Sequence, residues 1–211
     1  RLELNTIRCL NADEDSAFSD GDEPFLLPVA IFIDGNTVKL DTLGTSTALL
    51  KSAPSAHGNL GRTHVKAGDR FAIPESTGLF TSTLSLIDTK GLADPKGVTI
   101  AGIAVVALEQ DGTTNSAMMA GYRTFVNTLQ TELNTAIRSL KSPDIPAIQA
   151  KVKEAVTHTI KIETLKQLNI VGAVDPDDMI ASQFAQFTFA QLETAGPAGK
   201  TFTMEMRNSD G

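Results

Sequence analysis

The amino-acid sequence predicts a mainly β protein, an antiparallel β-sandwich of about seven or eight strands that carries an inserted α-helical hairpin. Two observations support this prediction. Short runs of aliphatic, β-branched and aromatic residues are separated by turn-forming Asp, Asn, Gly and Pro along most of the chain. Between residues 115 and 168, apolar residues instead recur every three or four positions, which is typical of helices. We interpret residues 1–211 as one sandwich domain and residues 115–168 as a hairpin inserted within it.

The first part of the chain predicts three strands. Residues 2–10 mix Leu, Ile, Thr and Cys, a composition typical of strands. Residues 25–33 form an almost continuous apolar run, which predicts a strand buried on both faces, and Pro28 within it indicates an edge position or a bulge. An Asp-Gly-Asn turn signal at residues 34–36 precedes a short returning strand at residues 37–40.

The remaining strands lie on both sides of the helical insertion. Residues 41–64 are rich in Gly, Ser, Thr and Ala and predict a long loop with one short helical turn. Further strands are predicted at residues 65–74, 79–87, 98–108, 184–189 and 201–206. Residues 98–108 are the most apolar of these, and we therefore expect them to form a central strand.

A long amphipathic helix is predicted from about residue 116 to residue 140, with Thr114 or Asn115 as its cap. Its apolar stripe consists of Met118, Tyr122, Phe125, Val126, Leu129, Leu133, Ile137 and Leu140. Pro143 ends this helix, and a second helix follows up to about Gln167. Because the connection is so short, we expect the two helices to pack as an antiparallel hairpin.

Length and composition limit the possible classes of protein. A chain of 211 residues suffices for one sizeable domain, and its single cysteine excludes both an internal disulfide and a cysteine-based zinc site. The net charge of -7 disfavours a general nucleic-acid binder, and no apolar run approaches the ~20 residues that span a bilayer. The printed chain shows no signal-peptide pattern, and an extracellular or cell-surface location is slightly favoured.

The negative charge is concentrated in three short stretches that adjoin predicted strands. Residues 11–24 carry six acidic side chains and no basic one, residues 109–111 carry two, and residues 175–178 carry three. Inter-strand loops of a sandwich gather at its ends, so these stretches can meet there. Their carboxylates then repel one another unless a cation lies among them. The alternative is that they are three separate solvated turns.

Hard oxygen ligands favour calcium, which takes roughly six to eight of them. The predicted ligands are all carboxylates: Asp15, Asp20, Asp22, Glu109, Asp111, Asp175, Asp177 and Asp178. An EF-hand is excluded, because the position that requires a bidentate Glu holds Pro24, Leu26 or Ile31 in the three possible registers. Transition metals are expected to recruit imidazole or thiolate, and the three histidines lie away from these stretches in the sequence.

Three acidic motifs also carry a family resemblance. They are SDGDEPFLLPV around Asp22, VVALEQD with Glu109 and Asp111, and VDPDDMIAS with Asp177 and Asp178. They resemble the first calcium loop and the two ends of the third calcium loop of C-two domains, which are calcium-dependent membrane-binding sandwiches. Their order is similar to that in an uncharacterised bacterial and fungal group of sandwich proteins with a helical insertion. The resemblance implies a calcium-binding sandwich, and it says little about membranes.

These features predict a non-enzymatic calcium-binding module that mediates binding or assembly, through a protein partner or through self-association. Membrane binding is only weakly supported, and nucleic acid is not an expected partner. One alternative is a structural protein that assembles into oligomers or filaments without an ion, through exposed edge strands or an apolar hairpin face. A less favoured hypothesis is an acid/base hydrolase that uses the same carboxylates.

Overall fold

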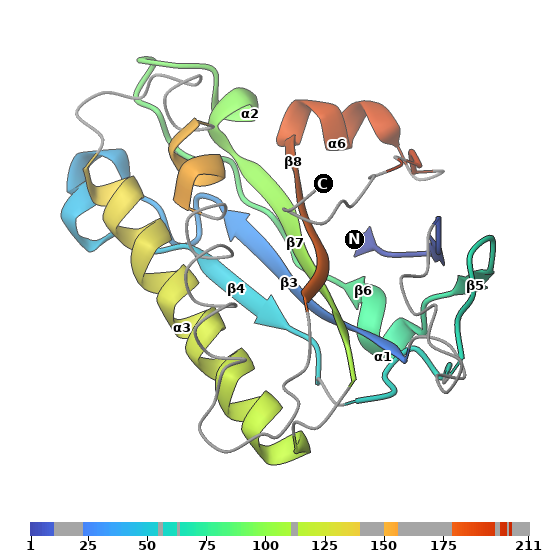
Figure 1. The fold of residues 1–211 in the computed structure, drawn as a ribbon. Helices are drawn as coiled ribbons and strands as arrows, with labels where there is room; N and C mark the ends of the chain where they lie inside the picture. Colours follow the sequence, from blue (N-terminus) through green and yellow to red (C-terminus); the bar gives the residue numbers. More distant parts are fainter. Residues whose placement is uncertain are drawn as a thin grey trace.

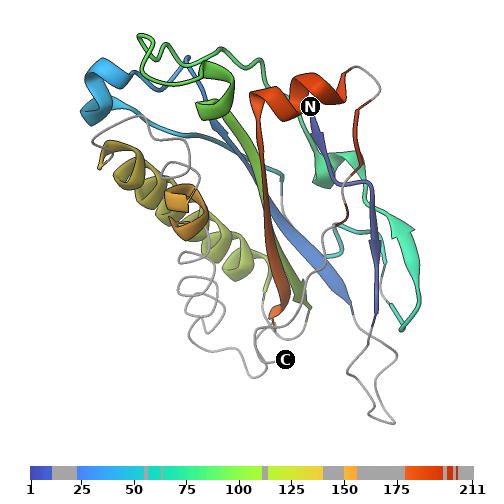
Figure 2. The ribbon, with the colours of Figure 1, turned by 90° about the horizontal axis from the view of Figure 1, so that it is seen from above.

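The computed structural model describes residues 1–10, 23–54, 57–62, 64–110, 114–139, 150–155, 179–196, 199–201 and 203. Its centre is an antiparallel sheet of four strands, in the order β4 (Leu49–Ser52), β3 (Pro24–Ile33), β7 (Ile100–Glu109) and β8 (Met179–Thr188). The helix α3 (Asn115–Arg138) covers one face of this sheet (Figure 1). Short strands from the N-terminal part of the chain cover the other face (Figure 2).

The pairing of β3 with β7 forms the core of the sheet. All ten residues of β3 are buried, and the register runs from Pro24 opposite Glu109 to Ile33 opposite Ile100. Successive side chains of a strand point to opposite faces, so each strand contributes to two separate apolar clusters. Phe25 and Val29 pack toward α3, whereas Leu26 and Ala30 pack toward the short strands. The prediction of a strand at residues 25–33 that is buried on both faces is confirmed.

Pro28 lies in the part of β3 that is paired on one side only. The strand β4 pairs with residues 29–32 of β3, so the missing N–H of Pro28 interrupts no ladder on that side. The carbonyl oxygen of Pro28 accepts a hydrogen bond of 2.6 Å from the hydroxyl of Tyr122 in α3. The sequence-based expectation of an edge position for Pro28 therefore holds locally, although β3 is an inner strand of the sheet.

The predicted long helix is confirmed, with bounds that differ by one or two residues. The Oγ1 atom of Thr114 accepts a hydrogen bond from the backbone N–H of Ala117 and caps the helix. Its buried side chains follow the predicted stripe: Met118, Tyr122, Phe125, Leu129, Leu133 and Ile137. None of the helices that the structure describes combines the length and the apolarity needed to cross a bilayer.

The polar side of α3 covers the edge of the sheet next to β4. The Oδ1 atom of Asn134 accepts a hydrogen bond of 2.9 Å from the backbone N–H of Ala48, just before β4. The Nε2 atom of Gln130 donates to the carbonyl oxygen of the same residue at 2.8 Å. Both backbone groups of Ala48 are thus satisfied by helix side chains, where a further strand would otherwise provide the partners.

Only a short part of the predicted second helix lies among the described residues. Residues 150–155 are helical, and Val152 and Ala155 are buried in the same cluster as the apolar side of α3. Figure 1 shows this short helix beside α3. The other residues expected in the second half of the 115–168 hairpin lie outside the described part of the chain.

The second face of the sheet corrects the prediction of a mainly β sandwich. It is covered by two ribbons of two strands each, β1 (Leu2–Glu3) with β6 (Leu79–Phe80) and β2 (Thr6–Arg8) with β5 (Arg70–Ala72). The antiparallel pairing of the strands is confirmed. Because these sheets are open and the described residues contain several helices, the architecture is mixed α and β.

Local turn chemistry explains why several predicted strands are shorter or absent. Residues 2–10 form two strands with different partners, β1 and β2. Residues 65–74 and 79–87 contain only the short strands β5 and β6, and the predicted loop at 41–64 contains β4. The turn that starts at Asp34 continues, because its carbonyl oxygen accepts hydrogen bonds from the N–H groups of Thr37 and Val38. A 3-10 helix, η1 (Leu40–Thr45), therefore follows the turn where a returning strand at 37–40 was expected.

The short helices complete the fold. They are α1 (Glu75–Gly78), α2 (Pro95–Val98) and α6 (Phe189–Ala195). The last of these corrects the prediction that a strand continues to Phe189, because a capping box between Thr188 and Gln191 starts a helix there. The predicted strand at 201–206 lies mostly outside the described residues.

A glycine in β7 provides a test of this packing. A Cβ atom added to Gly102 would lie 2.8 Å from the ring of Phe184 in β8 and 2.9 Å from the carbonyl oxygen of Ala185. We therefore expect Gly102→Ala to lower the free energy of unfolding by about 1–3 kcal/mol in urea denaturation. The matched control is Gly44→Ala, where an added Cβ meets nothing within 4 Å. Equal stability of Gly102→Ala and the parent protein would contradict the close packing of β8 on β7.

The buried Tyr122 provides a second test, with a defined pH dependence. Tyr122→Phe leaves the carbonyl of Pro28 without its donor, and we expect a loss of about 1–3 kcal/mol at neutral pH. Burial raises the pKa of the Tyr122 hydroxyl above its ordinary value of 10.0. The unfolded state therefore releases this proton first, and the stability that the hydroxyl confers decreases as the pH rises above about 10.

The alkaline half of this prediction can be measured directly. Tyr122 is the single tyrosine of the chain, so near-ultraviolet tyrosinate absorbance reports on it alone. The stability difference between the parent protein and Tyr122→Phe is expected to shrink in alkaline solution. Titration of Tyr122 at its ordinary pKa in the folded protein would contradict its burial.

Candidate functional site

One end of the central sheet brings together three strand ends that are far apart in the sequence. Pro24, at the start of β3, lies opposite Glu109 at the end of β7. Leu108, one residue before that end, lies opposite Met179 at the start of β8. The backbone N–H of Gln110 also donates to the carbonyl oxygen of Glu23 at 3.1 Å. We call this end of the sheet the acidic end.

The acidic end is where the three acidic stretches join the sheet. Residues 11–24 lead into β3, residues 109–111 start at the end of β7, and residues 175–178 lead into β8. Antiparallel neighbours alternate in direction, so the start of β3, the end of β7 and the start of β8 must lie at the same end. This arrangement follows from the register of the strands and requires no assumption about the loops themselves.

The described residues include one of the eight predicted calcium ligands. Glu109 is the last residue of β7 and is half-buried. The other predicted ligands lie outside the described residues: Asp15, Asp20, Asp22, Asp111, Asp175, Asp177 and Asp178. Within the described ranges, no group of three or more His, Cys, Asp or Glu side chains is arranged to hold a metal ion. The ligand set therefore stays a prediction.

Side-chain hydrogen bonds fix β3 close to the acidic end. The amide of Asn59 pairs with both backbone groups of Leu26, donating to its carbonyl oxygen at 2.6 Å and accepting from its N–H at 3.0 Å. The backbone carbonyl oxygen of Asn59 in turn accepts from the hydroxyl of Thr77 at 2.9 Å. An amide side chain presents a donor and an acceptor, as a peptide group does, so Asn59 replaces a neighbouring strand at this position.

A histidine also lies near the acidic end, which the sequence did not indicate. The imidazole of His57 packs edge-on against the ring of Phe25, with ring centroids 4.8 Å apart and planes at 74°. The backbone N–H of His57 donates to Oδ1 of Asn115, at the start of α3, at 3.1 Å. His57 is distant from the acidic stretches in the sequence, and the fold places it against Phe25 at the start of β3. Sequence spacing could not reveal this contact, because it joins residues 32 positions apart.

The opposite end of the sheet has a different charge arrangement. There the backbone N–H of Ile87 donates a hydrogen bond of 3.0 Å to Oγ1 of Thr99, and this bond holds the loop that follows Ile87. The ammonium group of Lys90 binds the carboxylate of Asp88 in this loop. The hydrogen bond from the Lys90 side chain lowers the pKa of the Asp88 carboxyl group, which is fully exposed. Asp88 thus has a cationic neighbour from its own loop, and it offers a reference carboxylate remote from the acidic end.

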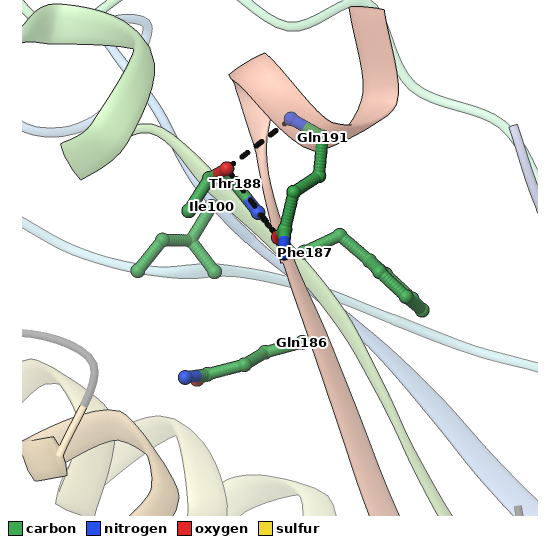
Figure 3. Close-up of a pocket in the computed structure, with 5 residues that line it drawn as sticks. All are labelled: Ile100, Gln186, Phe187, Thr188 and Gln191. Carbon is green, nitrogen blue, oxygen red and sulfur yellow. Dashed lines mark hydrogen bonds between the residues drawn. The ribbon is translucent and has the colours of Figure 1, made fainter. Parts of the chain in front are cut away.

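A small cavity lies along β8, near its junction with α6. It has a volume of about 350 Å³ and is lined by Ile100, Gln186, Phe187, Thr188 and Gln191. Thr188 and Gln191 are joined by hydrogen bonds, and the side chains of Gln186 and Phe187 point to opposite sides of the strand (Figure 3). The lining contains no titratable group, so these residues offer hydrogen bonds and apolar contact but no acid/base chemistry.

Comparison of the chain with protein-family models, with curated proteins and with solved structures gives no significant match. The resemblance of the acidic motifs to C-two domains therefore stays a prediction.

Substitution of Asn59 tests whether its side chain stabilises β3 close to the acidic end. Asn59→Ala removes one hydrogen-bond partner from each backbone group of Leu26, which is buried. We expect a loss of about 1–3 kcal/mol in the free energy of unfolding, measured by urea denaturation. The matched control is Asn127→Ala on the exposed side of α3, where the change should be within about 0.5 kcal/mol. Equal effects of the two substitutions would show that Asn59 does not support β3.

Proposed function

We propose that the chain is a non-enzymatic calcium-binding module that mediates binding or assembly, with its ion at the acidic end of the central sheet. One observation carries the proposal: the register of β3, β7 and β8 joins all three acidic stretches to the same end of the sheet. The proposed ligands come from the eight predicted carboxylates, and Glu109 belongs to the strand β7 itself.

Electrostatic energies explain why a cation is expected there. Two like charges 4 Å apart repel by about 4 kcal/mol at the effective dielectric constant near a protein surface. The three stretches carry six, two and three acidic side chains, so several such repulsions arise where the carboxylates approach one another. A divalent cation among the carboxylates attracts each of them and so offsets their mutual repulsion. Ligands that are all oxygen atoms favour calcium over zinc or copper.

The expected consequence is a stability that depends on calcium. A ligand that binds only the folded state stabilises it by about 2.7 kcal/mol when its free concentration is about 100 times Kd. We expect urea unfolding to require more denaturant in calcium than in chelator, with magnesium having a smaller effect. Identical unfolding curves in calcium and in chelator would contradict the proposal.

Three single substitutions locate the ion. Asp111→Asn and Asp178→Asn are expected to reduce the calcium-dependent stabilisation, and each should raise the stability in chelator because it removes a repulsive charge. The control Asp88→Asn also removes one negative charge, but at the opposite end of the sheet, and should leave the calcium effect unchanged. An equal loss of the calcium effect in all three variants would indicate a response to net charge rather than a site.

A second candidate function, assembly without a bound ion, is supported by a different feature. The strand β8 lies at the edge of the central sheet and contains no charged residue. Edge strands of this kind pair readily with a further strand.

A further inference from the structure

The strand β8 presents one row of backbone groups outward. Among the described residues, β8 pairs with β7 and with no other strand. The N–H of Phe189 donates to the carbonyl oxygen of Thr99 at 2.8 Å, which continues the ladder and fixes its phase. In an antiparallel ladder alternate residues bond to the neighbour, so the backbone groups of Ser182, Phe184 and Gln186 point away from β7.

Within the described part of the chain, the outward edge of β8 lacks the usual protection against strand addition. Its ten residues, MIASQFAQFT, include no charge, no proline and no glycine. Two outward N–H groups instead bond to nearby glutamine side chains. The N–H of Phe184 donates to Oε1 of Gln183 at 3.0 Å, and the N–H of Thr188 donates to Oε1 of Gln191 at 2.8 Å. These bonds cover N–H groups, whereas no described group donates to the outward carbonyl oxygens of Ser182, Phe184 and Gln186.

One side chain on this edge is an acceptor that lacks a donor. The Oε1 atom of Gln186 is buried and has no hydrogen-bond partner among the residues that the structure describes. Leaving such a group unpaired costs about 1–3 kcal/mol. Gln186 is one of the residues that line the cavity of about 350 Å³ along β8. Its side chain extends from the side of the strand opposite to the side chain of Phe187 (Figure 3). A rotation of the Gln186 side chain that brings Oε1 from the interior to a donor at the edge would remove this cost.

We propose that β8 pairs antiparallel with β8 of a second copy of the chain, about a two-fold axis at Phe184. In this register Phe184 lies opposite Phe184 of the partner subunit, and Ser182 of the partner subunit lies opposite Gln186. Directly opposed residues share a face of the sheet, so the hydroxyl of Ser182 can donate to Oε1 of Gln186 once that side chain turns toward the edge. The outward backbone groups of the two strands bond to each other, and the N–H of Phe184 exchanges the Gln183 side chain for the carbonyl oxygen of Phe184 of the partner subunit. Two four-stranded sheets then become one continuous sheet.

Charge explains why the occupant is a second copy of the same strand. Each chain carries a net charge of -7, so most surfaces of two copies repel. The strand β8 brings no charged side chain to the contact, and an isologous pair therefore opposes no like charges along it. This pairing does not depend on the cation at the acidic end, and the two proposals fail separately.

Substitution of Ser182 tests the pairing in the presence of chelator. Ser182→Pro removes an N–H that points away from β7, so the fold should persist while the new ladder is blocked. Sedimentation velocity should show a concentration-dependent dimer for the parent protein and a monomer for Ser182→Pro, with the same circular dichroism spectrum. Ser182→Ala keeps the N–H and loses the hydroxyl in both symmetric contacts, so the dimer Kd should rise about tenfold. A parent protein that stays monomeric, or a Ser182→Pro variant that dimerises equally, would overturn the proposal.

Disulfide cross-linking tests the register and does not rely on the proline variant. In a Cys9→Ser background, protein with Ser182→Cys is mixed with protein with Gln186→Cys and oxidised. Opposed residues have Cα atoms about 5.5 Å apart, within the range for a disulfide, whereas two copies of position 182 lie about 14 Å apart. The mixed disulfide should therefore exceed both like-with-like products. Predominance of like-with-like disulfides, or no cross-linking, would refute this register.

Discussion

The pairing of β3 with β7 is the constraint on which the other parts of the structure depend. Both strands have ten residues and an almost uniformly buried pattern, so neither can tolerate water on either face. Two covering layers are therefore required, and the chain supplies α3 for one face and the short ribbons for the other. The same register decides which strand ends meet at the acidic end. The core packing and the candidate ion site thus have one common cause.

The open stretches of the central sheet are closed mainly by amide side chains. Asn59 covers Leu26 in the one-sided part of β3, and Gln130 with Asn134 covers Ala48 before β4. A side-chain amide carries both a donor and an acceptor, so it can satisfy the backbone without adding a strand. At β8 the glutamine contacts reach N–H groups only. This difference is why we locate a contact between copies at β8 and not at the β4 edge.

The two proposals use different parts of the sheet and different forces. Cation binding at the acidic end depends on the repulsion of carboxylates at one end of the strands. Pairing through β8 depends on backbone hydrogen bonds along an uncharged edge. An ion can therefore order the end of the sheet while the edge recruits a second copy. A module with both properties would join calcium-dependent stability to assembly.

The sequence alone determined the elements whose pattern is long and regular. The apolar runs that became β3 and β7 and the stripe from Met118 to Ile137 were predictable, because burial imposes a period on each type of element. The concentration of acidic residues next to strand ends was also visible. The bounds of short elements such as β1, β5 and η1 were not predictable, because single backbone hydrogen bonds and turns decide them.

Only the tertiary structure decided which strands are neighbours, and these pairings join the three acidic stretches to the same end of the sheet. The register that sets Pro24 opposite Glu109 depends on contacts 85 positions apart, for which a single sequence holds no local signal. The contact of His57 with Phe25 and the covering of Leu26 by Asn59 are of the same kind. The sequence determined how much charge and apolar surface the chain carries, whereas the pairing of the strands determined where they meet.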